Sequence, residues 1–370
     1  MDIFPTDLES IENRIRAVDP EQYTSTRNYN DGAVTRLSPY ISRGVISTKQ
    51  VFQHLKTLNL PWYKTEKLVQ ELAWRDYWQQ VWRAKGEGIK QDIKHRQQPV
   101  TNHQIPAAIV NAETGIEEVD EAIKQLYRTG YMHNHMRMYV ASICCNVAKS
   151  HWLQPAKWMY SHLLDGDLAS NYLSWQWVSG AFSSKKYYAN QWNINTYFNS
   201  TQQNTFLDVD YEEFECMETP RQLLDLKSLR LETVLPTSGK PLFEKNKTSL
   251  IYNYYNIDPY WYQGQDVQRV FLIEPSFFQK NPVSQKCLDF ALDLTKNIVG
   301  IQTFVGEFSE LAEQIHTEYI LYKEHPASMH YKGREEPREW MSSVEGFYLS
   351  FFAFWKKCKK EIRVEVEQEY

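Results

Sequence analysis

The chain has 370 residues, a formal net charge of -5 and a mean hydropathy of -0.59. This length suggests roughly two or three domains. No apolar run approaches the roughly 20 residues that a bilayer span needs, and the acidic start MDIFPTDLESIE lacks the features of a signal peptide. The five cysteines are scattered, odd in number and without metal-ligand spacing. We therefore expect a cytoplasmic protein with reduced cysteines, no metal site and no membrane association.

Charge and aromatic content narrow the choice of partner. The net negative charge argues against broad, nonspecific binding to polyanions, although it leaves room for a local basic groove. Aromatic residues are frequent, with 12 Trp, 24 Tyr and 17 Phe. They indicate either large hydrophobic cores or platforms on which flat ligands or bases stack.

Residues 1–200 are predicted to form one helical domain. The stretch 65–85 has apolar residues at helical spacing and contains no helix breaker. Residues 119–130 predict a helix that ends at Gly130 as its C-cap. Residues 131–152 have a period near 3.6, and a further helix over 155–164 has Pro155 in its first turn.

The composition and patterning of the sequence change near residue 200. Residues 201–245 mix polar and turn residues and are predicted to be a connecting segment with short helical pieces. Beyond it, residues 246–340 are predicted to form a small α/β domain. Its expected elements are strands at 248–256 and 267–275, a helix at 283–298, and strands at 300–308 and 317–325. Within residues 341–370, the stretch 344–362 is predicted to be a helix whose aromatic face packs back onto the body.

Two stretches in the first hundred residues contain candidate binding side chains, placed around a turn in one and on one helical face in the other. The segment TRLSPYISRGVIS at 35–47 places hydroxyls and two arginines around a Pro-containing turn, which suits either a phosphate or an ordinary solvated helix cap. In ELAWRDYW, residues Glu71, Trp74, Arg75 and Trp78 share one helical face. That face is either a partly buried ion pair beneath packed tryptophans or a wall that stacks a base and hydrogen-bonds its polar edge.

Two further stretches lie in the second hundred residues. In MHNHMRM, residues Asn134, Arg137 and Met138 share a face, whereas neighbouring histidines two residues apart point in different directions and do not suggest a metal site. In DGDLASNYLSWQW, the steps of four between Asp167, Asn171 and Trp175 define another face. The first stretch could simply be an exposed polar stripe, and the second a capped helix start with core tryptophans behind it.

Taken together, these stretches resemble the flavin-binding helical domain of the photolyase/cryptochrome family. The matching words are TRLSPY, ELAWRDYW, TGYMHNHMRM, VASI and LLDGDLASNYLSWQW, and the resemblance covers roughly residues 20–200. It implies an α-helical FAD-binding domain of photolyase type, with the small α/β domain C-terminal to it. MHN and WQW are more similar to the class that acts on cyclobutane pyrimidine dimers than to the (6-4) class.

The resemblance implies a set of FAD contacts. Hydroxyls and an arginine at residues 35–38 match the phosphate-binding positions, Arg137 and Asp165 match a charge pair beside the isoalloxazine, and Asn171 matches the amide facing flavin N5. An Asn at that position can accept from N5–H. The implied FAD-binding residues are Tyr23, Thr35, Arg36, Leu37, Ser38, Arg75, Asn134, Arg137, Asp165, Asp167 and Asn171.

The resemblance also implies a substrate and a reaction. Glu71 matches a carboxyl that hydrogen-bonds the dimer, Trp74 and Trp177 match aromatics that flank it, and Met138 matches an apolar contact. The implied reaction is the splitting of a flipped dimer in UV-damaged DNA by an electron from excited reduced FAD, base flipping by photolyases being a known general case. Trp175 and Trp152 match the inner and middle members of an electron-transfer chain, while Trp158, Tyr139 and Trp82 stay open as outer members.

Several positions depart from the family pattern. His135 replaces a usual Arg, and Val34 stands where a hydroxyl is common. The segment 180–199 is similar to the iron–sulfur branch, but the cysteines of that branch have no counterparts, so we expect no iron–sulfur cluster. Relatives carry an α/β antenna domain before the flavin domain, whereas here an α/β segment follows it, which predicts a permuted and reduced domain with an unassigned antenna chromophore.

The sequence therefore predicts a monomeric, light-dependent cyclobutane pyrimidine dimer photolyase that binds FAD and UV-damaged DNA. The alternative is a cryptochrome-like blue-light photoreceptor without repair activity. A third class, a flavin-free helical nucleic-acid-binding module, would lack bound flavin.

Overall fold

The computed structural model describes residues 3–237 and 241–367 and divides into two compact units. Unit 1 comprises residues 1–20, 35–84 and 232–370, and unit 2 comprises residues 21–34 and 85–231. The units reflect spatial proximity, and they group residues 35–84 with the α/β region. The sequence domains 1–200, 201–245 and 246–340 stay a prediction.

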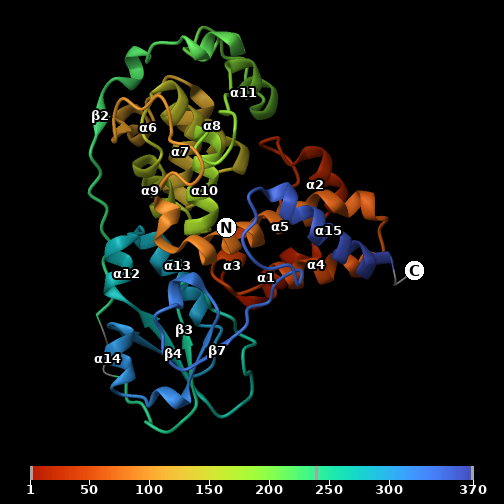
Figure 1. The fold of residues 1–370 in the computed structure, drawn as a ribbon, viewed down its shortest axis with the longest axis vertical. Coiled ribbons are helices and arrows are strands. Elements are labelled where there is room, and N and C mark those ends of the chain that lie inside the picture. The colour runs from red at the N-terminus through yellow and green to blue at the C-terminus, as the bar shows by residue number, and fades with distance from the viewer. Residues whose placement is uncertain (1–2, 238–240, 368–370) are drawn as a thin grey trace. The chain divides into compact units, whose positions relative to one another are not determined.

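Unit 1 is built around a five-stranded parallel sheet (Figure 1). Its strand order is β5-β4-β3-β6-β7, so the first strand is central and the chain winds outward in both directions, as in doubly wound folds. Helices α12 (Pro275–Lys280) and α13 (Gln285–Thr295) connect β4 to β5, and α14 (Phe308–Ala312) lies in the connection from β5 to β6. The strands are β3 (Ser249–Tyr252), β4 (Gln268–Ile273), β5 (Ile301–Val305), β6 (Ile320–Lys323) and β7 (Arg334–Glu336).

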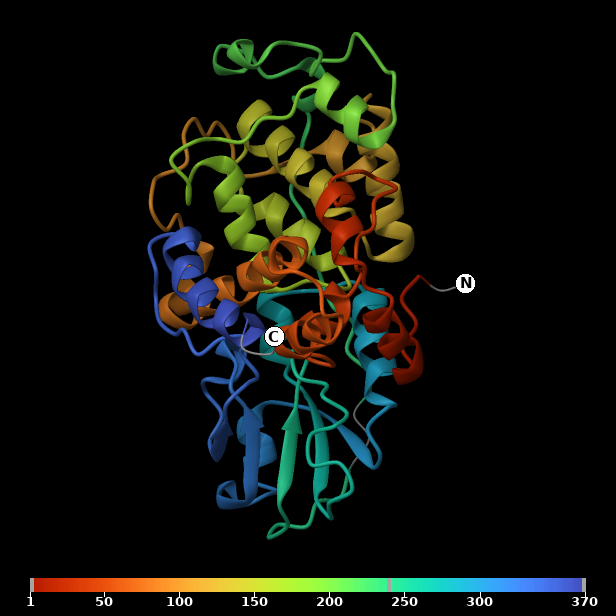
Figure 2. The same ribbon diagram turned by 90° about the vertical axis from the view of Figure 1, so that its right-hand side faces the viewer.

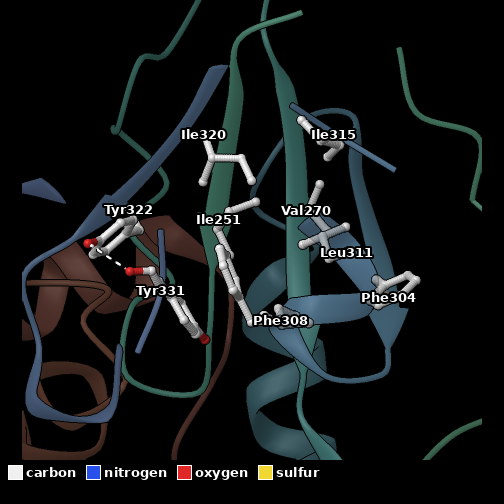
Figure 3. Packing of buried hydrophobic residues seen from close by; sticks show 10 residues of the cluster. Ile251, Val270, Phe304, Phe308, Leu311, Ile315, Ile320, Tyr322 and Tyr331 are labelled. Atoms are coloured by element: carbon white, nitrogen blue, oxygen red, sulfur yellow. Dashed lines mark hydrogen bonds between the residues drawn. The ribbon is translucent and has the colours of Figure 1, made fainter. Parts of the chain in front are cut away.

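One face of this sheet is covered by a hydrophobic cluster from strands, α14 and the adjoining loops (Figure 3). The Phe308 and Tyr331 rings stack with centroids 4.5 Å apart, and the Tyr322 hydroxyl donates to the Tyr331 carbonyl at 3.3 Å. Strands β3 and β4 are buried along nearly their whole length, which accounts for their continuous apolar sequences. The cluster consists of Ile251, Val270, Leu272, Phe304, Phe308, Leu311, Ile315, Ile320, Tyr322 and Tyr331.

The remaining helices of unit 1 come from both ends of its sequence. The N-terminal group consists of α1 (Leu8–Arg16), α3 (Ser38–Ser42), α4 (Thr48–Thr57) and α5 (Trp62–Lys85). The C-terminal α15 (Phe351–Glu367) lies beside α5 (Figure 1, Figure 2). Gly44 follows α3 with φ of 64°, and a Cβ there would lie 2.4 Å from the Tyr255 carbonyl oxygen. This close approach therefore requires glycine.

Unit 2 is mainly helical. It contains α2 (Pro20–Thr26, whose first residue belongs to unit 1), α6 (Ala107–Asn111), α7 (Glu117–Thr129), α8 (Asn134–Ser142), α9 (Leu153–His162), α10 (Leu168–Ser179) and α11 (Gln191–Phe198). Strand β1 (Ile105–Pro106) pairs with β2 (Leu226–Lys227) in antiparallel fashion. Short 3-10 helices lie at η1 (Gly86–Lys90), η3 (Tyr211–Glu215) and η4 (Arg221–Leu223).

The predicted elements are largely present. The helix ending at Gly130 is confirmed, since Gly130 adopts the left-handed conformation at the end of α7. Several details differ from the sequence expectation, and strands β1 and β2 and helices α12 and α14 were not predicted. The period over 131–152 continues beyond α8 only as a π-helical segment, η2 (Ile143–Val147); α15 begins at Phe351 rather than 344; and strand β7 was not predicted. Strand β7 is short and exposed, so it lacks an apolar pattern.

Among the residues described, none of the helices combines the length and apolarity that a bilayer span requires.

Candidate functional site

The candidate site residues fall into two groups, one in each unit. Unit 1 holds Thr35, Arg36, Leu37, Ser38, Glu71, Trp74 and Arg75, and unit 2 holds Tyr23, Asn134, Arg137, Met138, Trp152, Asp165, Asp167, Asn171, Trp175 and Trp177. Most of the unit 2 group lies on or directly before α8, α9 and α10.

An ion pair between α8 and the start of α10 is the best-defined polar feature of unit 2. The Arg137 Nη2 lies 3.0 Å from Asp165 Oδ2, and the two side chains are 18% and 4% exposed. Arg137 Nε also donates to the Met132 carbonyl at 2.8 Å. A guanidinium held by two partners in a sheltered place has a fixed orientation. The pair that the resemblance implies is therefore present, although its relation to a flavin is a proposal.

Helix α10 begins where the sequence indicates. Asp167 is its N-cap, and the Asp167 carboxylate accepts from the Ser170 N–H at 2.7 Å. Four residues later, the Asn171 amide donates to the Ala156 carbonyl of α9 at 2.8 Å. Asn171 and Trp175 are both buried, with 9% and 2% exposure. The row is thus a sheltered helix face with a capped start and a buried tryptophan behind it, as the structural alternative for this stretch describes.

The remaining tryptophans of the group have different surroundings. Trp152 is fully buried, and its Nε1–H donates to the Asp92 carboxylate at 2.7 Å. The side chain of His151 lies beside the same carboxylate, at 3.5 Å. Trp177 is partly exposed and has the Tyr187 ring as a neighbour, at 6.0 Å between centroids. Trp177 therefore has the accessible surface that stacking requires.

In unit 1, the turn at residues 35–38 leads directly into α3. Arg36 is exposed and has a positive φ of 51°, while Leu37 is buried and anchors the turn. The Thr35 hydroxyl accepts from the Leu37 N–H at 3.4 Å. This arrangement leaves the Arg36 side chain directed away from the core, as a phosphate contact requires.

Two other arginines near this turn are held by the protein itself. Arg75 Nη1 donates to the Ser42 hydroxyl at 2.8 Å, which joins α5 to α3. Arg43 is fully buried, and its guanidinium lies 3.6 Å from the centre of the Tyr254 ring. Arg43 is therefore part of the packing against the loop after β3 and not an exposed phosphate ligand.

The face of α5 that was predicted to meet substrate is only partly open. Glu71 pairs with Lys67 one turn earlier at 2.7 Å, and its side chain is 31% exposed. The Trp74 ring stacks on Phe351 of α15, with centroids 3.7 Å apart and planes 10° apart. One face of Trp74 is thus already covered by an aromatic side chain of the same unit.

The segment that carries Phe351 is fastened along α5 by several hydrogen bonds. The buried Asp76 carboxylate accepts from the Thr48 hydroxyl at 2.9 Å and from the Met341 N–H at 3.0 Å. The Tyr77 hydroxyl donates to the Tyr348 carbonyl at 3.0 Å. Burial raises the pKa of Asp76 above its usual range, and the positive charge of Arg338 opposes this shift. These contacts make residues 338–362 a fixed part of unit 1.

Each of the two groups, taken by itself, offers donors and acceptors of a type that a nucleotide cofactor needs. Exposed Arg36 and the hydroxyls of the turn suit phosphate oxygens, while the amide and carboxylates around α10 suit ring donors and acceptors. The Ser170 hydroxyl, in the first turn of α10, is buried and finds no hydrogen-bond partner among the described residues. Within residues 3–237 and 241–367, no three His, Cys, Asp or Glu side chains are arranged to hold a metal ion.

Several contacts were not found from the sequence. The Lys67–Glu71 pair has a sequence signal, since the two residues are four apart on a helix. Asp92 and Phe351 have none, because each meets its tryptophan from a distant part of the chain. The five cysteines are all unpaired, as expected, and Cys216 alone among them is exposed.

Comparison with known proteins finds similarity to photolyases and cryptochromes, the family that the sequence motifs resemble. The family model for the FAD binding domain of DNA photolyase matches residues 68–212. A deoxyribodipyrimidine photo-lyase of Alkalihalophilus pseudofirmus is 31% identical over 154 residues, which are 39% of this chain and 31% of that protein. One from Streptomyces griseus is 32% identical over 161 residues, covering 41% and 35%. A cryptochrome DASH of Synechocystis is 28% identical over 168 residues, covering 43% and 34%.

Among solved structures, a Synechocystis cryptochrome aligns with a TM-score of 0.49 at 25% identity, covering 53% of this chain and 44% of that one. The chain spans about a third of the length of the curated relatives described above.

Proposed function

We infer that this chain belongs to the photolyase/cryptochrome family, since residues 68–212 match the FAD binding domain of DNA photolyase, and we propose that it uses bound FAD to repair cyclobutane pyrimidine dimers in DNA under light. The observation that carries the proposal is the sheltered Arg137–Asp165 pair next to the capped start of α10. It lies within the matched region and fixes a positive charge and two carboxylates in a defined arrangement. When bound, reduced FAD would supply the photochemical electron donor.

The residues of unit 2 would hold the ring of the cofactor. The guanidinium of Arg137 is held by Asp165 and the Met132 carbonyl, so it can bind a ring oxygen without reorientation. Asn171 has its amide N–H₂ engaged by Ala156, which directs its carbonyl oxygen as an acceptor. Asp167, Asn134 and Tyr23 complete the proposed contacts on this unit.

The residues of unit 1 would hold the phosphates of FAD and contribute to binding the pyrimidine dimer. Arg36 and the hydroxyls of Thr35 and Ser38 are the proposed phosphate contacts, beside the buried Leu37, and Arg75 is positioned by Ser42. Glu71 is accessible enough to accept a hydrogen bond from a base. Met138 and Trp177 of unit 2 are the proposed apolar and stacking contacts, and Trp175 and Trp152 the proposed electron relay.

A second function is favoured by one observation. Because Phe351 already covers one face of Trp74, this tryptophan has less surface to offer a flipped base. A blue-light photoreceptor that binds FAD without repairing DNA would tolerate this covering. Both functions predict bound FAD, and they differ in repair.

The test is an absorption spectrum followed by illumination with an oligonucleotide that contains a single dimer. We expect about one FAD per chain and light-dependent repair. Glu71→Gln should weaken binding of damaged DNA by roughly 5- to 150-fold, since losing a charged acceptor costs about 1–3 kcal/mol, and should keep FAD. Lys67→Gln is the matched control, because it removes the ion pair but leaves the carboxylate.

Each outcome distinguishes between the functions. Colourless but folded protein after incubation with FAD would contradict both of them. Bound FAD with no repair in the parent protein would support the photoreceptor. Equal losses in Glu71→Gln and Lys67→Gln would show that the ion pair, and not the carboxylate alone, matters for damaged DNA.

A further inference from the structure

The exposed side of α15 carries a basic stripe that the proposed cofactor and lesion contacts do not use. Helix α15 contains five basic and three acidic residues, and four of the basic residues fall within positions 356–360, in a chain whose net charge is -5. Phe352, Lys356, Lys360 and Arg363 are all exposed and follow each other at steps of three or four, so they share one helical face. The stripe is about 16 Å long at 1.5 Å per residue.

The two lysines at the centre of the stripe are available for a partner. Neither Lys356 nor Lys360 forms an ion pair with a side chain in the described part of the chain. The neighbouring charges are already engaged: Lys359 pairs with Glu66 of α5, and Glu361 accepts from the Ser343 N–H and hydroxyl. Lys356 and Lys360 therefore present positive charge that no ion pair compensates among the described residues, although the carboxylate of Glu361 follows Lys360 directly in the sequence.

The opposite side of α15 explains why the helix is held in place. Its apolar residues Phe351, Phe354, Trp355, Cys358 and Ile362 are all buried. A helix that lies on a membrane needs its apolar face for the lipid, and here that face is occupied within unit 1. The exposed side offers phosphate-binding charges with one aromatic residue, Phe352, at its N-terminal end. This composition is complementary to a nucleic-acid backbone.

We propose that the stripe formed by Phe352, Lys356, Lys360 and Arg363 binds the sugar–phosphate backbone of DNA. The proposal rests on the proposed function, since it assumes that DNA is the macromolecular substrate. Because α15 is fixed along α5 through the Phe351–Trp74 stack, DNA held by the stripe would be bound next to the helix that carries Glu71. The stripe would add affinity that does not depend on sequence or damage.

The test measures binding of a short undamaged DNA duplex to the full chain by fluorescence anisotropy over a range of salt concentrations. Each lysine–phosphate contact contributes about 0.9 to the slope of log affinity against log salt. Lys356→Gln/Lys360→Gln should therefore lower the magnitude of the slope by roughly 1.8 and weaken binding several-fold at low salt. The control is Lys280→Gln/Lys296→Gln, which neutralises two exposed lysines on or beside α12 and α13.

The outcomes separate this inference from the proposed function. An unchanged salt slope in Lys356→Gln/Lys360→Gln, together with normal FAD content and repair, would overturn the stripe and leave the function standing. Equal slope changes in the control would also overturn it, because net charge alone would then explain the effect. Lysine-dependent binding to anionic phospholipid vesicles but not to the duplex would overturn it in favour of a lipid surface. Lack of FAD would instead contradict the proposed function.

Discussion

Helices α5 and α10 carry most of the predicted catalytic and substrate residues, but they are enclosed in different ways. Helix α10 packs mainly against α8 and α9, which belong to its own unit and directly precede it in the chain, and also contacts the more distant η1 of the same unit. The Trp74 side of α5 instead meets Phe351, and its Tyr77 meets Tyr348, both from the end of the chain. A motif on α10 is thus supported locally, whereas one on α5 depends on a distant segment.

This difference shows what a sequence motif does and does not determine. The row Asp167, Asn171 and Trp175 indicates a sheltered helix face, and its neighbours follow from the short connections around it. The row Glu71, Trp74 and Trp78 is equally regular, but its accessibility depends on α15. Substitutions in the two regions can show whether the difference also appears in stability.

The largest expected effect is on the covering of α5. Phe351→Ala should lower the free energy of unfolding by about 3–5 kcal/mol, because it removes a buried aromatic ring that stacks on Trp74. The adjacent Phe352→Ala is the control, since Phe352 is 68% exposed and its loss should cost within about 0.5 kcal/mol. Urea unfolding measures both. Equal effects would mean that α15 is not fastened to α5 through Phe351.

A smaller effect is expected at the local polar pair of unit 2. Asp165→Asn should cost about 1.5–3 kcal/mol, because Arg137 loses a charged hydrogen-bond partner in a sheltered site. Glu121→Gln removes an acid from the exposed pair with Arg128 and should cost about 0–1 kcal/mol. Unfolding curves and FAD content of both variants provide the comparison. A cost for Glu121→Gln as large as that for Asp165→Asn would contradict the importance of shelter.

The smallest expected effect is the pH dependence contributed by His325, which packs on Trp82 of α5. Burial, with the positive charges of Arg338 and Arg43, lowers the pKa of His325 well below its usual value. The unfolded chain therefore binds a proton more readily. The neutral, buried imidazole therefore contributes its full stability above the unfolded pKa, near pH 6.5. As pH falls from there toward the folded pKa, the free energy of unfolding decreases by at most about 1.4 kcal/mol per pH unit.

His325→Asn tests that contribution. Asn can still accept the Ala327 N–H, which His325 Nδ1 accepts at 3.1 Å, but it does not titrate. The variant should be less stable at neutral pH, because it loses ring packing, and should lose less stability than the parent between pH 7 and pH 5. Unfolding by urea at several pH values checks this. Parallel pH profiles for the two proteins would show that His325 does not titrate differently on folding.

Much of the fold could be predicted because local patterns are strong. The apolar runs of β3 and β4, the helical spacing of α5 and the Gly130 C-cap are all visible in short windows of sequence. Strand β7 could not be predicted, because an exposed strand of three residues carries no apolar pattern. The start of α15 was placed too early, because the exposed apolar residues before Phe351 look like a continuing helix face.

The candidate site was predictable in residue type more than in environment. The spacing that joins Arg137 to Asp165 is not visible locally, and the pair was expected only from the resemblance, whereas the Asp167 cap follows from helix-start rules. For Arg43, in contrast, the structure departs from what the sequence suggested. Its position beside hydroxyl residues suggested a phosphate, but the loop after β3 buries it against Tyr254. Long-range packing decides such cases, and one sequence alone does not contain it.

The discontinuity of unit 1 has a consequence for how the protein is made. During synthesis Trp74 emerges long before Phe351, and at about 5–20 residues per second the interval between them is roughly 15–55 s. For that time the aromatic face of α5 lacks its final partner, while residues 85–231 of unit 2 have already been synthesised. The N-terminal helices are thus translated first, but their packing is completed last. The aromatic surface of α5 is therefore the part of the nascent chain that a chaperone would most need to cover.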